Sequence, residues 1–324
     1  MTSVPSRAVT SVPSRAVASV ASRAVIPAPP GTAPATADGA DGDLDQKIAA
    51  LRQRLADLGQ VLVAFSGGVD STYLLAEALN VLGDRAVALT AVSGTLPEAE
   101  YDDARALGQE LGARHLLVDS NELQIDGYRL NAPNRCYFCK TELYDLCVLK
   151  AAELGIGAIA DGCNLDDLGD YRPGRQAAAE HGIVSPLIEA RMTKADVRAA
   201  SARLGLRTAR KAAFACLGSR FPYGTEITPE RLSRIGACEQ VLREQGFHQF
   251  RCRFHDTVVR IELAPGELPR LFSEPGLSDA VVKAMKAQGF LYVTVDLQGY
   301  RQGAMNEALT HVQSVPASAL FKRG

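Results

Sequence analysis

The sequence lacks the features of a membrane or exported protein. None of its apolar runs approaches the roughly 20 residues that a helix needs to span a bilayer. The N-terminus also lacks the roughly 7–15-residue apolar core of a secretory signal, and the seven cysteines form no short, dense disulfide pattern. We therefore expect a cytoplasmic protein with no membrane partner, whose cysteines serve catalysis, metal binding or burial.

An excess of positive charge is also lacking. The 324 residues carry 35 Lys and Arg against 37 Asp and Glu, a formal charge of −2. Binding along a nucleic-acid backbone needs clustered Lys and Arg, so nucleic acid is not an expected partner. With 47% hydrophobic residues, a chain of this length can bury a sizeable core in two ordinary domains.

The chain begins with a repetitive, low-complexity tail. An eight-residue unit, TSVPSRAV, occurs twice, and the variant ASVASRAV follows. So few bulky apolar side chains cannot offset the entropy of ordering, and we predict disorder over residues 1–42. The favoured interpretation is an inert extension or a misplaced start codon, and an organelle transit peptide comes second. Beyond it we expect domains at 43–220 and 221–312 and a flexible C-terminus at 313–324.

Apolar periodicity predicts the fold class. The larger domain alternates short, fully apolar runs with segments of helical spacing, which is typical of a parallel twisted sheet with helices on both faces. Its expected strands are 61–65, 86–92, 115–118, 158–161 and 183–187. Its expected helices are 44–58, 71–81, 97–112 and 141–154. The smaller domain is predicted to be α+β with antiparallel character, with helices at 229–244 and 278–288 and strands at 250–254, 258–263 and 291–297.

A glycine-containing loop joins the first predicted strand to the next helix. It consists of Ser66, Gly67, Gly68, Val69, Asp70 and Ser71. A helix start offers unpaired backbone N–H groups and the positive end of the helix dipole. Glycines allow a close approach of an anion, and the serine hydroxyls add donors, so the loop is predicted to hold pyrophosphate. The sequence contains neither a GxxxxGK[ST] motif nor a GxGxxG fingerprint.

This loop resembles the PP-loop of the ATP pyrophosphatase superfamily, whose members cleave ATP between the α and β phosphates. The resemblance implies ATP and Mg²⁺ as cofactors. It also implies that the loop serines and glycines hold pyrophosphate and that Asp70 helps to bind magnesium.

Further segments resemble one branch, the LarE family of ATP-dependent sulfur transferases. They are NRCYFCK (134–140), DGCNLDD (161–167), DYRPG (170–174), ACLGSRFPYG (215–224) and FRCRFHD (250–256). The resemblance covers about residues 44–310. It makes 43–220 the PP-loop ATP pyrophosphatase domain and 221–312 a substrate or oligomerisation domain, and it implies a homo-oligomer.

The LarE resemblance implies a two-stage reaction on a small-molecule substrate. A carboxylate of a pyridinium mononucleotide attacks the ATP α-phosphorus, and a sulfur nucleophile then displaces AMP to leave a thiocarboxylate. The product belongs to the biosynthesis of the nickel-pincer nucleotide cofactor. The alternatives are a tRNA thiolase or another AMP-forming synthetase of the superfamily, and a non-enzymatic nucleotide sensor.

Cys216 is the predicted sulfur donor. The resemblance implies that its sulfur attaches to the substrate and that the C–S bond then breaks to leave dehydroalanine. Lys211, Arg210 and Arg220 are close in sequence, and their charge favours a thiolate. Ser219 and Arg220 are predicted catalytic residues of the same segment. The competing interpretation is a buried structural cysteine.

Cys136 and Cys139 form a CxxC pair, which places two thiols within one coordination shell. With Cys216 they make three, and the resemblance implies a [4Fe–4S] cluster that carries an exchangeable sulfide. A zinc site completed elsewhere and free thiols are the alternatives. The other cysteines are predicted to be buried: Cys147, Cys163, Cys238 and Cys252.

Two further groups are candidate ligands. Asp161 and Asp167 follow a predicted strand at the loop's end of the sheet, where hard oxygen ligands suit magnesium or a ribose; a solvated loop is the alternative. Arg251 and Arg253 alternate along a strand, so they share a face and are predicted to grip the substrate phosphate. Glu239, on the preceding helix, is assigned to the active site by the resemblance. Surface ion pairs are the alternative for these three.

Overall fold

The computed structural model describes residues 38–168, 173–212, 215–301 and 304. The predictions for residues 1–37 and 313–324 lie outside this range. The described residues from Gly39 onward form one compact unit. Within the described part of the chain, no helix is both long enough and apolar enough to cross a membrane.

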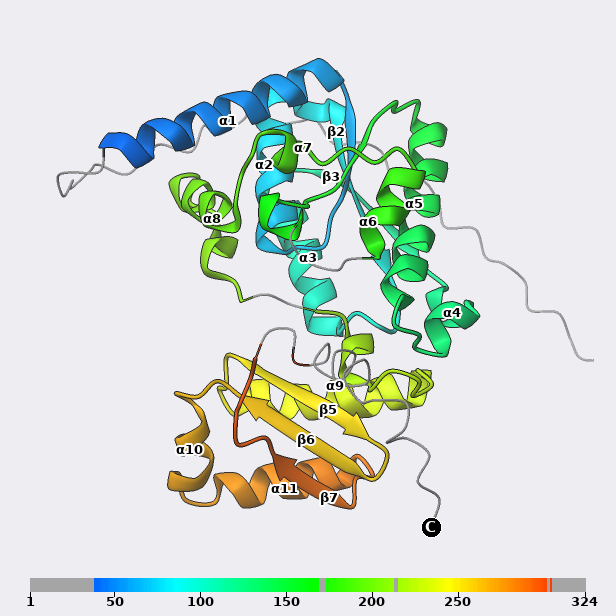
Figure 1. Ribbon diagram of the computed structural model, residues 1–324, viewed down its shortest axis with the longest axis vertical. Coiled ribbons are helices and arrows are strands. Elements are labelled where there is room, and N and C mark those ends of the chain that lie inside the picture. The colour runs from blue at the N-terminus through cyan, green and yellow to red at the C-terminus, as the bar shows by residue number, and fades with distance from the viewer. Residues whose placement is uncertain (1–37, 169–172, 213–214, 302–303, 305–324) are drawn as a thin grey trace, which may run out of the picture. The chain divides into compact units, whose positions relative to one another are not determined.

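A four-stranded parallel sheet organises the first part of this unit. Its order is β3-β2-β1-β4, and Figure 1 labels β2 and β3 of this sheet. The strands are β1 (Val61–Ala64), β2 (Ala86–Val92), β3 (Arg114–Asp119) and β4 (Ile159–Ala160). The helices of this part are α1 (Asp38–Leu58), α2 (Val69–Leu82), α3 (Glu98–Glu110), α4 (Asp126–Arg129), α5 (Arg135–Leu154), α6 (Gly174–Glu180), α7 (Pro186–Glu189) and α8 (Lys194–Arg203).

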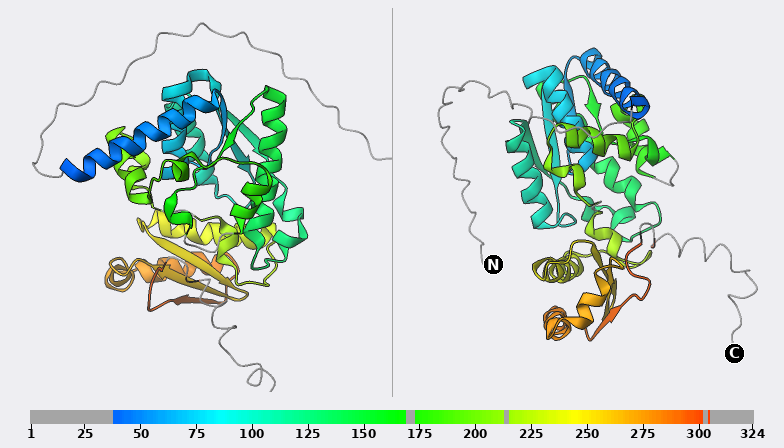
Figure 2. Two further views of the ribbon diagram at one scale, coloured as in Figure 1. Left: turned by 45° about the horizontal axis from the view of Figure 1, so that its top comes forward. Right: turned by 90° about the vertical axis from the view of Figure 1, so that its left-hand side faces the viewer.

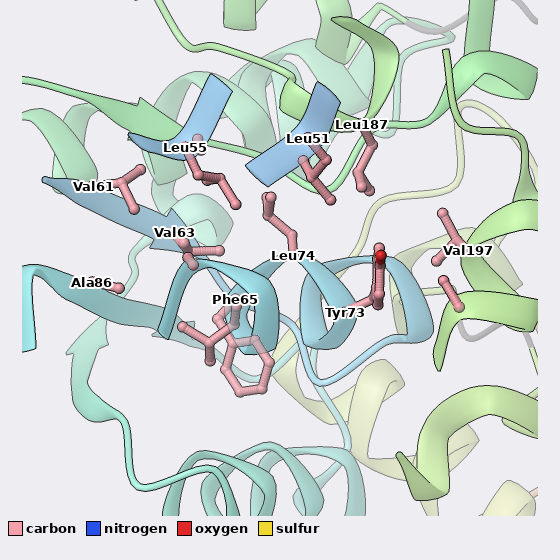
Figure 3. Packing of buried hydrophobic residues seen from close by; sticks show 14 of the residues in the cluster. Leu51, Leu55, Val61, Val63, Phe65, Tyr73, Leu74, Ala86, Leu187 and Val197 are labelled. Carbon is pink, nitrogen blue, oxygen red and sulfur yellow. The ribbon is translucent and has the colours of Figure 1, made fainter. Parts of the chain in front are cut away.

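Side-chain alternation along β1 explains why helices cover both faces of this sheet. Val61 and Val63 belong to a core shared with α1, α2, α3 and α8, part of which is seen in Figure 3. Leu62 and Ala64 point the other way and pack with Cys147 of α5. Successive strand residues face opposite sides, so a continuous apolar run is needed where both faces are buried.

A second, three-stranded sheet follows, in the order β5-β6-β7 (Figure 2). Its elements are α9 (Pro229–Glu244), β5 (Phe250–His255), β6 (Val258–Leu263), α10 (Leu268–Ser273), α11 (Leu277–Ala287) and β7 (Tyr292–Val295). β5 and β6 pair antiparallel as predicted, whereas β6 and β7 pair in parallel. The parallel pairing is possible because α10 and α11 supply the crossover that parallel neighbours need.

Three of the predicted elements differ clearly from the structure, and the helices α4, α6, α8 and α10 were not predicted. The first helix begins at Asp38 rather than at residue 44. The helix predicted at 141–154 begins at Arg135, so the CxxC pair lies on its first turns. The strand predicted at 183–187 is wrong: only Val184 bridges to Ala160, and Pro186 then starts α7. Proline has no N–H to donate to a ladder and suits a first helical position.

Candidate functional site

The predicted pyrophosphate loop lies between β1 and α2. Gly68 is the N-cap of α2, and no side chain among the described residues caps this helix. Its first N–H groups therefore remain available to an anion. Inside the loop, the Ser66 N–H donates to Ser71 Oγ at 3.2 Å, and the two serine hydroxyls lie 3.1 Å apart. The side chain of Val69 is buried in the core and anchors the helix. Val69 can therefore offer an anion its backbone N–H but not its side chain.

Two glycines hold the loop close to its neighbours. Gly67 has φ +67°, and a Cβ there would lie 3.0 Å from the backbone and side chain of Ala104 in α3. A Cβ on Gly162 would lie 2.8 Å from the Ser71 nitrogen. Only glycine fits either position without displacing backbone. The DGCN segment after β4 thus packs directly against the start of α2.

Asp70 is paired with a lysine that the sequence analysis did not select. Lys194, the first residue of α8, forms an ion pair with Asp70 Oδ2. The Asn164 amide donates to Asp70 Oδ1 at 3.2 Å. The ammonium thus occupies a position beside the carboxylate that was predicted to bind magnesium. It also brings a positive charge to the loop, which suits a phosphate ligand.

Lys211, which was predicted to stabilise a Cys216 thiolate, binds the glycine loop. Its ammonium donates to the Gly67 carbonyl at 3.1 Å and to Asp103 at 2.6 Å, and it lies 2.9 Å from Glu100. Burial opposes ionisation of Asp103, but hydrogen bonds from Lys211 and Arg207 outweigh it and hold its pKa below the usual value. Lys211 therefore ties the loop to α3.

Asp161 and Asp167 hold the turn that follows β4. Asp161 is buried and accepts hydrogen bonds from Tyr144 (3.0 Å), Ser185 (2.7 Å) and the Cys163 N–H (3.2 Å). Asp167 accepts from the Asn164 N–H at 3.1 Å. These bonds shape the DGCN turn. Binding of magnesium or ribose by either carboxylate stays a prediction, and Asp161 would have to exchange donors to do so.

The Cys216 turn is held by a buried ion pair. Cys216 precedes a short 3₁₀ helix, η5 (Leu217–Arg220). Arg220 is fully buried and binds Glu239 of α9 through two bonds of 2.8 and 2.9 Å. Its remaining nitrogen donates to the carbonyls of Ala215 (2.7 Å) and Cys216 (3.1 Å) and to Ser219 Oγ (2.8 Å). Arg220 and Glu239 thus position the backbone of Cys216.

Ser219 and the two strand arginines extend this network. Ser219 donates from its hydroxyl to the Cys216 carbonyl at 2.9 Å. Arg253 binds Glu262 through two bonds of 3.0 and 2.8 Å and donates to the Ser219 carbonyl at 2.9 Å. Arg251 stacks on Tyr300 at 4.9 Å, and burial followed by the charge of Arg220 lowers its pKa. Binding of a substrate phosphate by Arg251 and Arg253 stays a prediction, and Arg253 already pairs with Glu262.

The three cysteines of the predicted cluster share one region. Burial raises the pKa of Cys136 and Cys139, and a nearby Cys216 thiolate raises both further. Part of Cys136 is exposed to solvent. The protein packed around its sulfur still makes burial the main cause of its raised pKa. Of the cations predicted to favour a Cys216 thiolate, Arg220 interacts electrostatically with Cys216.

These groups do not form a metal site as they lie. Across the described ranges, no group of three or more His, Cys, Asp and Glu side chains is arranged to hold a metal ion. The three thiols therefore do not fit the predicted cluster in this arrangement. The same holds for Asp70 with Asp161 and Asp167 and a magnesium ion. The predicted buried cysteines Cys147, Cys238 and Cys252 are buried, and Cys163 is intermediate.

Comparison with known proteins places the chain in a family. No family model matches the sequence. An uncharacterized protein of Synechocystis sp. is 47% identical over 267 residues, which is 82% of this chain and 99% of that protein. Pyridinium-3,5-bisthiocarboxylic acid mononucleotide synthase of Lactiplantibacillus plantarum is 41% identical over 271 residues, 83% of this chain and 97% of that protein. The chain belongs to the LarE family.

Membership of the LarE family makes the chain an enzyme of the synthase and transferase type. GMP synthase of Chlamydia muridarum is 34% identical over 77 residues, 24% of this chain and 15% of that protein. This shorter match, together with the parallel sheet and its glycine loop, agrees with a PP-loop fold in the LarE family.

Proposed function

We propose that this enzyme uses ATP to activate a carboxylate of a pyridinium mononucleotide and converts it to a thiocarboxylate. The observation that carries the proposal is the glycine loop at the uncapped start of α2, flanked by Lys194 and Lys211. The Lactiplantibacillus plantarum relative supports the product class, because it is a synthase of a bisthiocarboxylic acid mononucleotide. This reaction would be a step in the biosynthesis of the nickel-pincer nucleotide cofactor.

In the first stage the loop binds the phosphates of ATP. The N–H groups at the start of α2 and the hydroxyls of Ser66 and Ser71 bind the β and γ phosphates. The Lys194 ammonium moves from Asp70 to a phosphate oxygen. Asp70 would then be free to hold the magnesium of Mg-ATP, which would offset the negative charge of the phosphates. A substrate carboxylate oxygen attacks the α-phosphorus, the bond to the β-phosphate oxygen breaks, and pyrophosphate leaves. The carboxylate thereby gains AMP as a leaving group.

In the second stage Cys216 delivers sulfur. Its thiolate attacks the activated carbonyl carbon, and AMP leaves with its phosphate oxygen, which gives a thioester between protein and substrate. A base removes the Cys216 Cα proton, the electron pair forms the Cα–Cβ double bond, and the C–S bond breaks. The sulfur leaves with its electron pair as the thiocarboxylate, and dehydroalanine remains in the chain. No external oxidant or reductant is required.

Two variants separate the stages. Asp70→Ala should abolish pyrophosphate release from Mg-ATP and the carboxylated mononucleotide, because the magnesium of Mg-ATP would lose its carboxylate ligand in the loop. Asp84→Ala, at an exposed carboxylate between α2 and β2, should release pyrophosphate at the wild-type rate. Cys216→Ala should release pyrophosphate but form no thiocarboxylate. Release by Asp70→Ala at the wild-type rate would overturn the role of the loop.

A further inference from the structure

Tyr128 carries a buried hydroxyl that has no partner among the described residues. The side chain lies on α4 and is 1% exposed. Its Oη makes no hydrogen bond. Leaving a buried hydroxyl unsatisfied is unfavourable, whereas phenylalanine would fill the same apolar space at no such cost. The hydroxyl therefore points to a partner that joins the site from outside or forms during the reaction.

This hydroxyl lies on the Cys216 turn. A Cβ built on Gly218 would be 2.4 Å from Tyr128 Oη, so the oxygen rests directly against the backbone two residues after Cys216. Leu217 belongs to the same core as Tyr128, and Cys139 packs against that core. Tyr128 is thus placed between the turn that carries Cys216 and the helix that carries Cys139.

The oxygen acceptors near this position are already occupied. The Cys216 carbonyl accepts from the Ser219 N–H, the Ser219 hydroxyl and Arg220. Buried Glu122 accepts from the hydroxyls of Ser93 (2.7 Å) and Ser120 (2.6 Å) and from that of Thr95. Cys216, Cys139, Glu122 and Arg135 all interact electrostatically with the phenol. A guanidinium cannot accept a hydrogen bond, and the Glu122 oxygens are taken, so the two sulfurs are the acceptors that remain among these groups. A phenol is protonated near neutral pH, so the hydroxyl is a donor.

We propose that Tyr128 is a positioning residue whose hydroxyl donates a hydrogen bond to the reacting sulfur of Cys216. The inference rests on the proposed function. The bond would hold the sulfur in one rotamer and favour its anionic form, both before attack and when the C–S bond breaks. Activation of the substrate by ATP does not involve it.

The test compares Tyr128→Phe with Tyr73→Phe in the full-length protein. Tyr73 lies on α2, is fully buried and belongs to the other core, where its hydroxyl interacts with the Glu77 carboxylate. Each substitution removes one buried phenol oxygen, and the oxygen of Tyr128 is the one of the two that lies beside thiols. The readouts are pyrophosphate release, single-turnover thiocarboxylate formation, and alkylation of Cys216 by iodoacetamide at fixed pH, followed by peptide mapping.

We expect Tyr128→Phe to slow thiocarboxylate formation and Cys216 alkylation by about three- to tenfold, because loss of a charge-assisted hydrogen bond is partly offset by higher intrinsic nucleophilicity. Pyrophosphate release and the Tm should not fall, and Tyr73→Phe should match the wild type throughout. Unchanged transfer and alkylation in Tyr128→Phe would overturn the proposal, as would faster alkylation with a lower Tm. If the wild type releases no pyrophosphate, the proposed function fails, and the alkylation rates still test Tyr128.

Discussion

At the scale of single residues, the site depends on two buried arginine–carboxylate pairs. Arg220 binds Glu239 and Arg253 binds Glu262, and all four side chains are almost fully buried. A buried guanidinium needs a partner for its charge and all its donors. Because the spare donors of both arginines bind backbone carbonyls between Ala215 and Ser219, these pairs fix the Cys216 turn.

Removing one partner from such a pair should cost stability. We expect Glu239→Gln to lower the free energy of unfolding by about 3 kcal/mol or more, since it leaves the Arg220 charge uncompensated in the interior. The matched control is Glu274→Gln, which weakens an exposed i,i+4 pair with Arg270 and should have little effect. Urea unfolding measures both, and equal losses in the two variants would refute the structural importance of the buried pair.

Residue-level contacts were the part that the sequence predicted least well. The motifs identified Asp70, Arg220 and Arg253, and the resemblance identified Glu239, but the sequence did not pair any of them with a partner. Lys194 is 124 positions from Asp70, Glu239 is 19 from Arg220, and Glu262 is 9 from Arg253. Such pairs follow from the packing of whole elements, which no local pattern contains. Tyr128 gave no signal in the sequence, because it lies outside the motifs, in a segment of mixed polarity, QIDGYRLN (124–131).

At the scale of elements, the central feature is the junction of β1, the glycine loop and α2. This junction was predictable, because an apolar strand, two glycines and a helical pattern follow one another directly in the sequence. The start of α5 was not predicted, although Asn134 is a favoured N-cap residue; in the structure its side chain makes no cap hydrogen bond. Packing of Phe138 and Cys139 on the second core decides that this segment is helical.

The loop geometry predicts different outcomes for two glycine substitutions. Gly67 and Gly59 have nearly equal φ values, +67° and +70°, but a Cβ on Gly59 would meet nothing within 4 Å. Gly59→Ala should therefore cost only the backbone strain, about 1–2 kcal/mol, and keep activity. Gly67→Ala adds the contact with Ala104 and should also abolish pyrophosphate release. Thermal unfolding and a pyrophosphate assay measure both, and an active Gly67→Ala enzyme would contradict the close packing.

The contact between α3 and the loop predicts a pH-dependent contribution to stability. The pKa of Asp103 is held below its usual value by Lys211 and Arg207, against the effect of burial. A depressed carboxylate pKa stabilises the fold above the unfolded-state value, about 3.9, and this stabilisation is lost as the pH falls through the folded value.

Asp103→Asn should therefore be less stable than the wild type at pH 7, and the difference should shrink below about pH 4. Asp102→Asn is the matched control, because Asp102 is exposed and pairs with Arg105 of its own helix. Urea unfolding at both pH values measures the difference. A loss in Asp103→Asn that persists unchanged in acid would show that the carboxylate charge is not its cause.

At the scale of the whole molecule, the Cys216 turn is attached to both cores. The Leu217 N–H donates to the Thr95 carbonyl at 2.9 Å, beyond β2 of the first sheet, and Arg253 of β5 donates to the Ser219 carbonyl. The sequence indicated two structural parts and their fold classes. It placed Cys216 near their boundary, but not the contacts that hold it there.

The most direct test of the proposed function is a single-turnover reaction under anaerobic conditions. The enzyme is mixed with Mg-ATP and the carboxylated pyridinium mononucleotide, and the protein is then analysed by intact mass and peptide mapping. If Cys216 donates the sulfur, we expect one thiocarboxylate per chain and conversion of Cys216 to dehydroalanine. Product that accumulates over several turnovers while Cys216 stays intact would contradict it and would favour a sulfide carried by Cys136, Cys139 and Cys216.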